Sequence, residues 1–244
     1  MPALTTTASV CWRIVGIYRA ENGGHVERLL APALAAGWST AWWALDRVAP
    51  ELEAHTVGEG PGEKLPLLDE ALERIGPPGG PVVLSDDDIA FERGDVVELV
   101  EVAARAGLGL AQPAHAAGSE VSHGLTRAQP RSRARLTTFV ESGPCVAIAP
   151  GWTDRVLPLP RERGMGWGLE LDWIDLAAEG CRLGIVDSVQ VVHLGKVGGT
   201  YDDTAIRARM RDELAARGVD EWGPLQQTLA TWRPWQRRPP WVEG

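Results

Sequence analysis

The feature that most constrains the fold is a repeated alternation of short apolar runs and amphipathic segments. The apolar runs are rich in Val, Ile, Leu and Trp and predict buried strands at 12–18, 38–45, 82–84 and 108–113. The segments between them carry apolar residues three and four positions apart and predict helices at 25–36, 63–75 and 96–106. Strands that alternate with helices favour an α/β fold with a mainly parallel central sheet covered by helices on both faces.

The pattern is less regular after Pro113. A polar segment at 120–135 carries four arginines and precedes a predicted helix at 170–178, a strand at 183–193 and a charged helix at 204–217. No internal repeat or linker divides the chain. We therefore expect a disordered N-terminus at 1–11, one catalytic domain at 12–220 and a C-terminal tail at 221–244 that is rich in Trp, Arg and Pro.

Composition excludes several classes of protein. The formal net charge of -9 argues against nucleic-acid binding, which needs a surplus of Lys and Arg. The three cysteines lie far apart without metal-ligand spacing, as is typical of a reducing cytoplasm. No signal peptide is evident, and no apolar run approaches the roughly 20 residues of a transmembrane helix. We expect a cytoplasmic protein.

Three consecutive carboxylates, Asp86, Asp87 and Asp88, follow the predicted strand at 82–84. Adjacent carboxylates repel one another, and a divalent cation relieves that repulsion. Carboxylate oxygens suit Mg²⁺ or Mn²⁺, and ligands of open α/β sheets bind at the carboxyl ends of strands. The segment therefore predicts a metal-assisted phosphate or diphosphate site; the alternative is an acidic turn in which Asp88 caps a helix.

Two later features predict site residues. The turn Gly164-Met-Gly-Trp-Gly168 opens the predicted helix that carries Glu170 and Asp172. Its glycines permit close approach of a ligand, Trp167 offers a face for a sugar ring, and one carboxylate is a candidate general base. The alternative is acidic residues that only complement a helix dipole. His193 ends an apolar strand and is a candidate metal ligand or a satisfied structural histidine.

Taken in order, these residues resemble the GT-A nucleotide-sugar glycosyltransferases, including their galactosyltransferase-like and family-2-like members. The resemblance covers about residues 12–200 and rests on Asp86-Asp87-Asp88, Gly166-Trp-Gly-x-Glu170-x-Asp172 and His193. The segment from Ser122 to Glu141 is also similar to a plant and bacterial family of unknown function. The fold implied is GT-A, a Rossmann-like α/β architecture.

The resemblance implies a role for each candidate. Asp88 and His193 ligate Mn²⁺ or Mg²⁺, and Asp86 contacts the ribose or the metal through water. The remaining donor contacts are assigned to Arg19, Asp46, Lys64 and Asp87. Trp167 and Gly168 face an unknown hydroxyl acceptor. The implied reaction moves a sugar from a UDP-linked donor with inversion.

One difference from the family pattern leaves the identity of the general base undecided between two residues. Inverting galactosyltransferase-like members place an Asp directly after the Glu, whereas this chain has Leu171. Residues two apart on a helix point about 200° apart, so only one of Glu170 and Asp172 is expected to face the site. Glu170 is nearest the family position and is the first choice.

Other functions remain open on the sequence. A sugar-phosphate nucleotidyltransferase also uses strand-end carboxylates, but the first turn here offers only Gly23-Gly24 and one arginine. A metal-dependent phosphoesterase needs more His and Asp than the pattern places. A non-catalytic GT-A-like protein that binds a nucleotide sugar or carbohydrate is the alternative outside enzymes. The basic segment with Arg127, Arg131, Arg133 and Arg135 is either a clamp for an anion or, by preference, a solvated mobile loop.

Overall fold

The computed structural model describes residues 11–76, 80–195 and 204–242. Apart from Cys11, the segment expected to be a disordered N-terminus lies outside the described residues. No helix in the described part of the chain has the length and apolar character needed to cross a bilayer.

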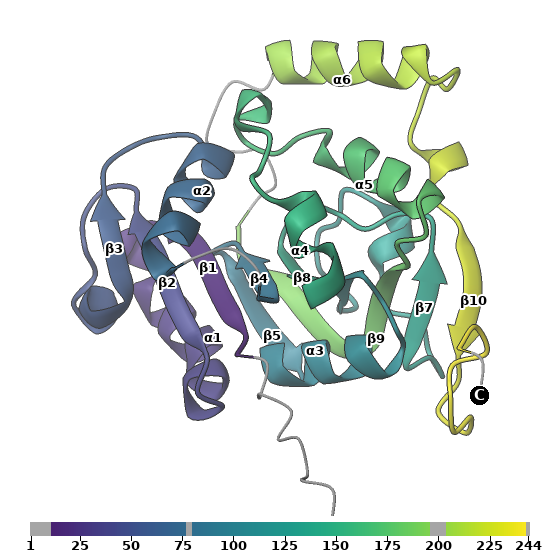
Figure 1. The fold of residues 1–244 in the computed structure, drawn as a ribbon, viewed down its shortest axis with the longest axis horizontal. Helices are drawn as coiled ribbons and strands as arrows, with labels where there is room; N and C mark the ends of the chain where they lie inside the picture. Colours follow the sequence, from purple (N-terminus) through teal and green to yellow (C-terminus); the bar gives the residue numbers. More distant parts are fainter. Residues whose placement is uncertain (1–10, 77–79, 196–203, 243–244) are drawn as a thin grey trace, which may run out of the picture.

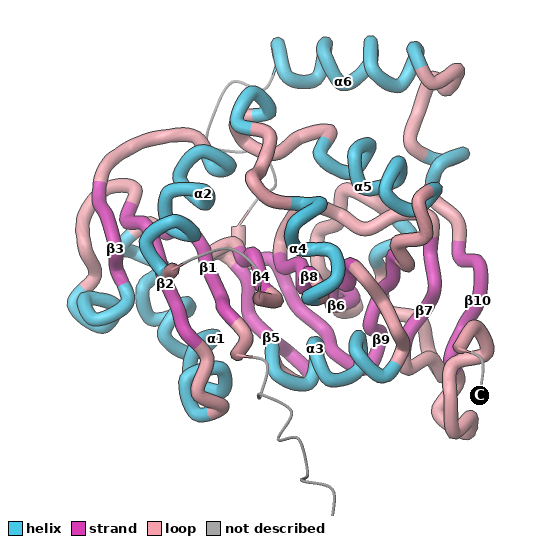
Figure 2. The backbone as a smooth tube through the Cα atoms, in the orientation of Figure 1, coloured by secondary structure: helices cyan, strands magenta, loops and turns pink. Residues whose placement is uncertain are grey.

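Ten strands of the described chain form one sheet (Figures 1 and 2). Their order is β10-β7-β9-β6-β8-β4-β1-β2-β3, and β5 pairs with β9 off this path. The strands are β1 (Arg13–Tyr18), β2 (Ser39–Ala44), β3 (Thr56–Glu59), β4 (Val82–Ser85), β5 (Ile89–Arg93), β6 (Leu110–His115), β7 (Ala134–Thr137), β8 (Cys145–Ile148), β9 (Leu183–His193) and β10 (Thr228–Trp232).

The sheet is mixed. Strands β3, β2, β1 and β4 are parallel, as the strand–helix alternation predicts, and β6 is parallel to β9. Antiparallel pairs join β4 to β8, β8 to β6, β9 to β7 and β5, and β7 to β10. The sheet therefore continues past residue 220, because β10 forms its edge within the segment expected to be a tail.

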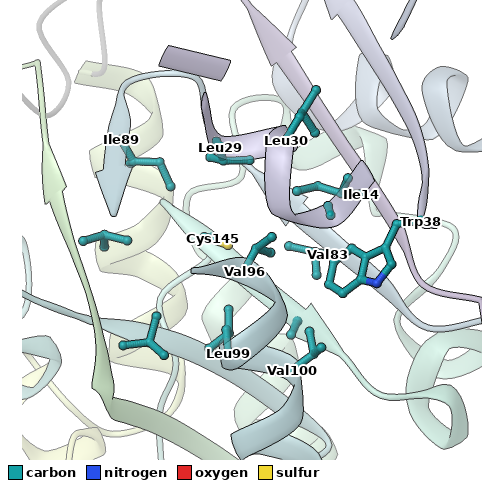
Figure 3. Packing of buried hydrophobic residues seen from close by; sticks show 14 of the residues in the cluster. Ile14, Leu29, Leu30, Trp38, Val83, Ile89, Val96, Leu99, Val100 and Cys145 are labelled. Atoms are coloured by element: carbon teal, nitrogen blue, oxygen red, sulfur yellow. The ribbon is translucent and has the colours of Figure 1, made fainter. Parts of the chain in front are cut away.

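Helices cover both faces of the sheet. They are α1 (Gly23–Ala35), α2 (Lys64–Ile75), α3 (Val96–Arg105), α4 (Pro150–Val156), α5 (Leu169–Ala178) and α6 (Thr204–Ala216). Apolar residues of α1 and α3 form one core with Ile14, Val83 and Trp38 (Figure 3). Residues of α2, α4 and α5 form a second core against the other face. The two cores fix the strand ends that carry the candidate site.

Strand order explains where polar side chains gather. The chain runs from β1 outward through β2 to β3, then returns to place β4 on the other side of β1. The carboxyl ends of β1 and β4 thus flank a topological switch point, the usual ligand crevice of open α/β sheets. Arg19 follows β1 and Asp86 follows β4, so both lie at this edge.

Candidate functional site

The three consecutive carboxylates point to different partners. Asp87 accepts hydrogen bonds from the Arg19 backbone N–H at 2.7 Å and from the Asn22 side-chain amide at 3.0 Å. Asp86 pairs with Lys64 at the start of α2, and its backbone N–H donates to the Pro144 carbonyl at 2.8 Å. Asp88 turns toward His193, with 3.5 Å between its Oδ2 and the His193 Nδ1. The triplet thereby joins three elements at one sheet edge.

Burial and neighbouring charge set the electrostatics of this edge. Burial raises the pKa of Asp87 to about 6, against the two hydrogen bonds that lower it. Burial also raises the pKa of Asp88, but its contact with His193 and the Lys64 charge outweigh burial and lower that pKa. For His193, burial lowers the pKa, and the carboxylates of Asp88, Asp86 and Glu141 raise it above its usual value.

The raised pKa of Asp87 predicts a pH dependence of stability. Its folded pKa of about 6 exceeds the ordinary 3.8, so the folded state binds more protons and stability falls as pH rises through this window. The comparison is made at about pH 5 and about pH 7.5 with a chelator present. Over this range the unfolding free energy of wild type should fall by about 1 kcal/mol more than that of Asp87→Asn, a value reduced to allow for the partial exposure of Asp87. Urea unfolding of both proteins measures this difference, and equal pH slopes would contradict it.

A histidine and a carboxylate that the sequence analysis did not select complete the cluster. His115, at the end of β6, stacks on His193 with ring centroids 5.6 Å apart. Its Nε2 lies 3.3 Å from Glu141 Oε2, and the Glu141 backbone N–H donates to the Gln112 side chain at 2.6 Å. His115 and His193 each keep a buried Nδ1 without a hydrogen-bond partner among the described residues. A buried ring nitrogen without a hydrogen bond is costly unless a ligand satisfies it, and of the two only the Nδ1 of His193 faces a carboxylate of the described chain, that of Asp88.

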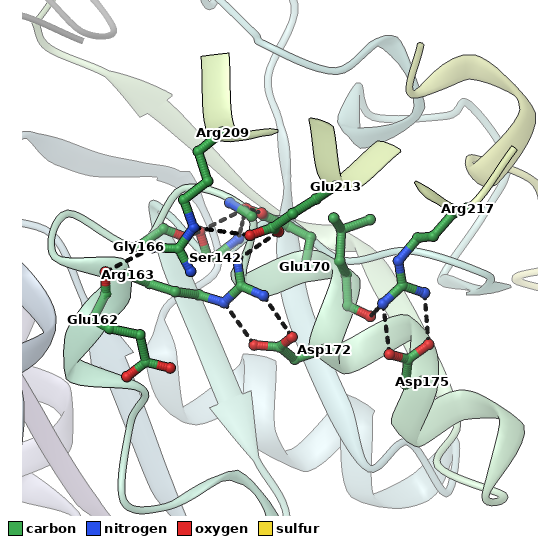
Figure 4. Close-up of polar contacts among 12 residues, drawn as sticks. Ser142, Glu162, Arg163, Gly166, Glu170, Asp172, Asp175, Arg209, Glu213 and Arg217 are labelled. Carbon is green, nitrogen blue, oxygen red and sulfur yellow. Dashed lines mark hydrogen bonds and ion pairs between the residues drawn. The ribbon is translucent and has the colours of Figure 1, made fainter. Parts of the chain in front are cut away.

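Glu170 is connected to this edge through the loop that precedes β8. Its Oε1 accepts hydrogen bonds from the Ser142 backbone N–H at 2.9 Å and from the Ser142 hydroxyl at 2.6 Å (Figure 4). Its Oε2 accepts from the Gly168 N–H at 3.1 Å. The next residue, Gly143, packs so closely that a Cβ there would lie 2.7 Å from Asp86 Oδ2. Glu170 therefore fixes the loop that lies against Asp86.

Asp172 faces a different neighbour. It forms a bidentate ion pair with Arg163, at 2.7 and 2.8 Å, and Arg163 also donates to Glu213 of α6 at 2.9 Å (Figure 4). Asp172 thus belongs to the polar contacts that join α5 to α6. Glu170 and Asp172 thus contact different neighbours, as expected for residues two positions apart on a helix.

The remaining predicted site residues lie in two different parts of the structure. Asp46 follows β2 and accepts hydrogen bonds from the Ala20 and Arg47 backbone N–H groups, the first of which chiefly lowers its pKa. Trp167 lies under α6, with the Arg207 guanidinium 4.7 Å from its ring centroid. Gly168 is the N-cap residue before α5 and lies in the left-handed region at φ 85°, which explains a glycine at this position. Trp167 and Gly168 therefore lie beside α6, while Asp46 lies beside β1.

The basic segment differs from the expected solvated loop at one residue. Arg135 is fully buried and forms a bidentate ion pair with the equally buried Asp187, both nitrogen–oxygen distances being 2.9 Å. Its remaining donors bond the carbonyls of Leu125 and Arg127. Asp187 lies far away in sequence, on β9, so composition alone does not reveal the pairing. The guanidinium of Arg135 is structural and is not available to clamp an anion.

No protein-family model and no curated protein matches this sequence. Among solved structures, GalNAc-T7 with UDP, GalNAc and Mn²⁺ has a TM-score of 0.57 and 7% identity, covering 88% of this chain and 49% of that one. S. aureus TarS 1-349 has a TM-score of 0.47 and 9% identity, covering 74% and 60%. The chain spans about half the length of the first of these proteins. The likeness to GalNAc-T7 identifies the fold as GT-A-like, as the sequence analysis predicts.

Proposed function

We propose that this chain is a metal-dependent glycosyltransferase that moves a sugar from a nucleotide-diphosphate sugar, UDP-linked, to an acceptor hydroxyl with inversion. The observation that carries the proposal is the convergence of Asp88 and His193 at the switch point of a GT-A-like sheet. Asp86 and Lys64 lie beside them.

The side chains at this edge fit Mn²⁺ or Mg²⁺ as an open site that substrate and water complete, and not as a closed metal cage. Within the described residues no three His, Cys, Asp or Glu side chains form a ready metal cage. However, Mg²⁺ in phosphate-transfer sites is commonly held by one or two carboxylates, with substrate phosphates and water completing its shell. Asp88 and His193, whose Nδ1 makes no hydrogen bond within the described chain and lies 3.5 Å from Asp88 Oδ2, suit such an open site, in which an ion would supply positive charge to the leaving diphosphate.

The remaining residues position donor and acceptor. Lys64 neutralises Asp86 and places a cation beside the expected diphosphate. Asp87 orders the turn after β1, where Arg19 and Asp46 contact the nucleotide. Trp167 and Gly168 form the acceptor side. The acceptor oxygen attacks the anomeric carbon as the carbon–oxygen bond to the diphosphate breaks, and a carboxylate takes the hydroxyl proton.

Glu170 is the better candidate for that carboxylate. A carboxylate offers about four acceptor positions, and Glu170 uses three of them for Ser142 and Gly168. One position on Oε2 remains for an acceptor hydroxyl, and the Ser142 loop connects this residue to Asp86. Among the described residues Asp172 uses only two positions, both for Arg163. Its contacts join α5 to α6 and not to the Asp86 edge, so the loop connection to Asp86 decides for Glu170.

Glu170→Gln and Asp172→Asn are therefore expected to differ sharply. Glu170→Gln should lower turnover by about 10²- to 10⁴-fold with nucleotide affinity retained, because it removes the base but keeps the shape. Asp172→Asn should lower it by less than about tenfold, since its ion pair is partly exposed. Release of the nucleoside diphosphate from the donor measures both. Full turnover in both variants would place the base elsewhere.

The test of the proposed function is a thermal-shift screen of nucleoside diphosphates and nucleotide sugars with and without Mn²⁺. At about 100 Kd a true ligand stabilises by about 2.7 kcal/mol, which raises the melting temperature by about 5–10 °C. A shift with one nucleotide only in the presence of metal, followed by donor turnover, supports the transferase. The same shift without turnover favours a non-catalytic binding protein, and a preference for a nucleoside triphosphate favours a nucleotidyltransferase. No shift with any nucleotide would overturn the proposal.

A further inference from the structure

A basic and aromatic cavity lies outside the candidate active site, where the chain continues beyond β10. It has a volume of about 440 Å³ and is lined by four arginines and two tryptophans, among other residues: Arg105, Arg133, Arg237, Arg238, Trp232 and Trp235. In Figure 1 this C-terminal segment lies at the lower end of β10, away from α5 and α6. We call these six residues the Arg–Trp patch.

The arginines of the patch lack carboxylate partners among the residues that the structure describes. Seven arginines elsewhere do pair with acidic side chains, namely Arg74, Arg135, Arg155, Arg161, Arg163, Arg209 and Arg217, whereas others such as Arg93 and Arg211 do not within the described part of the chain. The patch differs from those unpaired arginines because its four guanidinium groups line one cavity. The chain carries 33 acidic residues against 24 Lys and Arg, so carboxylates are not scarce. Four guanidinium groups gathered around one cavity without such partners concentrate positive charge on an otherwise acidic protein. That charge is complementary to an anionic ligand.

The aromatic side chains of the patch differ in exposure. Trp232 is buried and packs under the Arg133 guanidinium, which lies 5.5 Å from its ring centroid. Trp235 is 70% exposed, the largest exposure among the big apolar side chains of the described chain. An exposed indole next to arginines is typical of segments that lie at the interface between a bilayer and water.

The segment is held in place before any partner binds. The Trp241 indole N–H donates to the Ala106 carbonyl at 2.7 Å, and Arg133 donates to the Pro234 carbonyl at 3.1 Å. The Arg233 backbone N–H donates to the Gln236 side chain at 2.6 Å. Pro234, Pro239 and Pro240 further restrict the backbone. A pre-ordered surface loses little conformational entropy on docking.

We propose that the Arg–Trp patch docks this protein on an anionic phospholipid surface. Arg105, Arg237 and Arg238 are exposed rather than enclosed, which suits a planar array of headgroups better than a single small anion. Trp235 inserts at the headgroup level while the guanidinium groups contact lipid phosphates. The acidic remainder of the protein is repelled by the same surface, so the patch orients the molecule. This inference is independent of the proposed catalytic function.

The experiment is co-sedimentation of the full chain with vesicles of phosphatidylcholine alone and of phosphatidylcholine with about 30% phosphatidylglycerol. We expect binding to the second kind only, weakened in about 0.5 M NaCl. The double variant R237A/R238A should bind about 25-fold more weakly, about fivefold for each arginine, which corresponds to ~1 kcal/mol per cationic side chain. Trp235→Ala should bind about tenfold more weakly.

The matched control removes the same charge from another surface. Arg93 and Arg211 are exposed, and no carboxylate pairs with either among the described residues. The variant R93A/R211A should bind vesicles within about twofold of wild type, because neither arginine lines the cavity of the patch. Equal weakening by both double variants would mean that only net charge matters and would overturn the proposal.

Two further outcomes would also overturn it. If inorganic phosphate binds wild type but not R237A/R238A in calorimetry, and vesicles do not bind, the cavity is a site for a small soluble anion. If a single-stranded oligonucleotide binds through these arginines while vesicles do not, the partner is a nucleic acid. Nucleotide and Mn²⁺ binding at the Asp88 edge is measured separately and should be the same in R237A/R238A and wild type.

Discussion

Replacement of Asp88 by asparagine is expected to remove the Mn²⁺-dependent part of nucleotide binding, which amounts to a loss of at least about 100-fold in affinity for the nucleoside diphosphate. The variant keeps the size of the side chain but removes the charge. Asp88 is half-buried, and its Oδ2 lies 3.5 Å from His193 Nδ1, so a neutral amide leaves His193 as the sole strong ligand of the proposed pair. Nucleotide affinity with and without Mn²⁺, measured by calorimetry, gives the result directly.

The control for this prediction is Asp154→Asn. Asp154 is exposed on α4, and no partner of its side chain is found among the described residues, so its variant should keep full metal dependence. Urea unfolding of Asp88→Asn checks that the fold is intact. If folded Asp88→Asn retains metal-dependent binding equal to wild type, Asp88 is not a metal ligand and the triplet is a structural turn. Loss of binding with and without metal alike would instead indicate a direct nucleotide contact.

Local hydrophobic pattern predicts the longest described strand of the sheet and a helix on each of its faces. The strand predicted at 183–193 coincides with β9, and the helices predicted at 63–75 and 96–106 agree with α2 and α3 within a residue at either end. Strand β5 is missed because Ile89–Arg93 is short and follows the acidic triplet directly. It pairs with β9, whose residues lie about a hundred positions away, and the local spacing of apolar residues cannot predict such a pairing.

In the candidate site, too, local sequence rules select some residues and miss others. Asp86, Asp88 and His193 follow from one rule, that polar side chains at the carboxyl ends of strands face a ligand crevice. The same rule selects His115, which ends β6 and stacks on His193, although the sequence analysis does not apply it there. Glu141 carries no local signal, because its contact with His115 depends on the path of the loop before β8. Their roles in the reaction stay predictions.

The buried pair of Arg135 and Asp187 is expected to give the largest loss of stability. Arg135→Met leaves the Asp187 carboxylate buried without its partner, and also leaves the Leu125 and Arg127 carbonyls without donors. Removal of one member of a buried ion pair typically costs about 3–5 kcal/mol of unfolding free energy. Arg135→Lys keeps the charge but not the bidentate geometry and should cost about 1–3 kcal/mol. Urea unfolding at constant pH measures each variant.

The same substitution at an exposed pair provides the control. Arg155 pairs with Glu179 on the surface, where the two side chains are 53% and 48% exposed. Arg155→Met should therefore cost less than about 1 kcal/mol, because solvent screens exposed pairs. The double variant R135M/D187L removes the stranded charge and should recover part of the loss. The pair also holds the loop at 125–129 against β9, because Arg135 donates to the Leu125 carbonyl and the Gln129 backbone N–H donates to Asp187. If Arg135→Met costs no more than Arg155→Met, Asp187 must be protonated or hydrated without its partner, and the pair does not hold this loop.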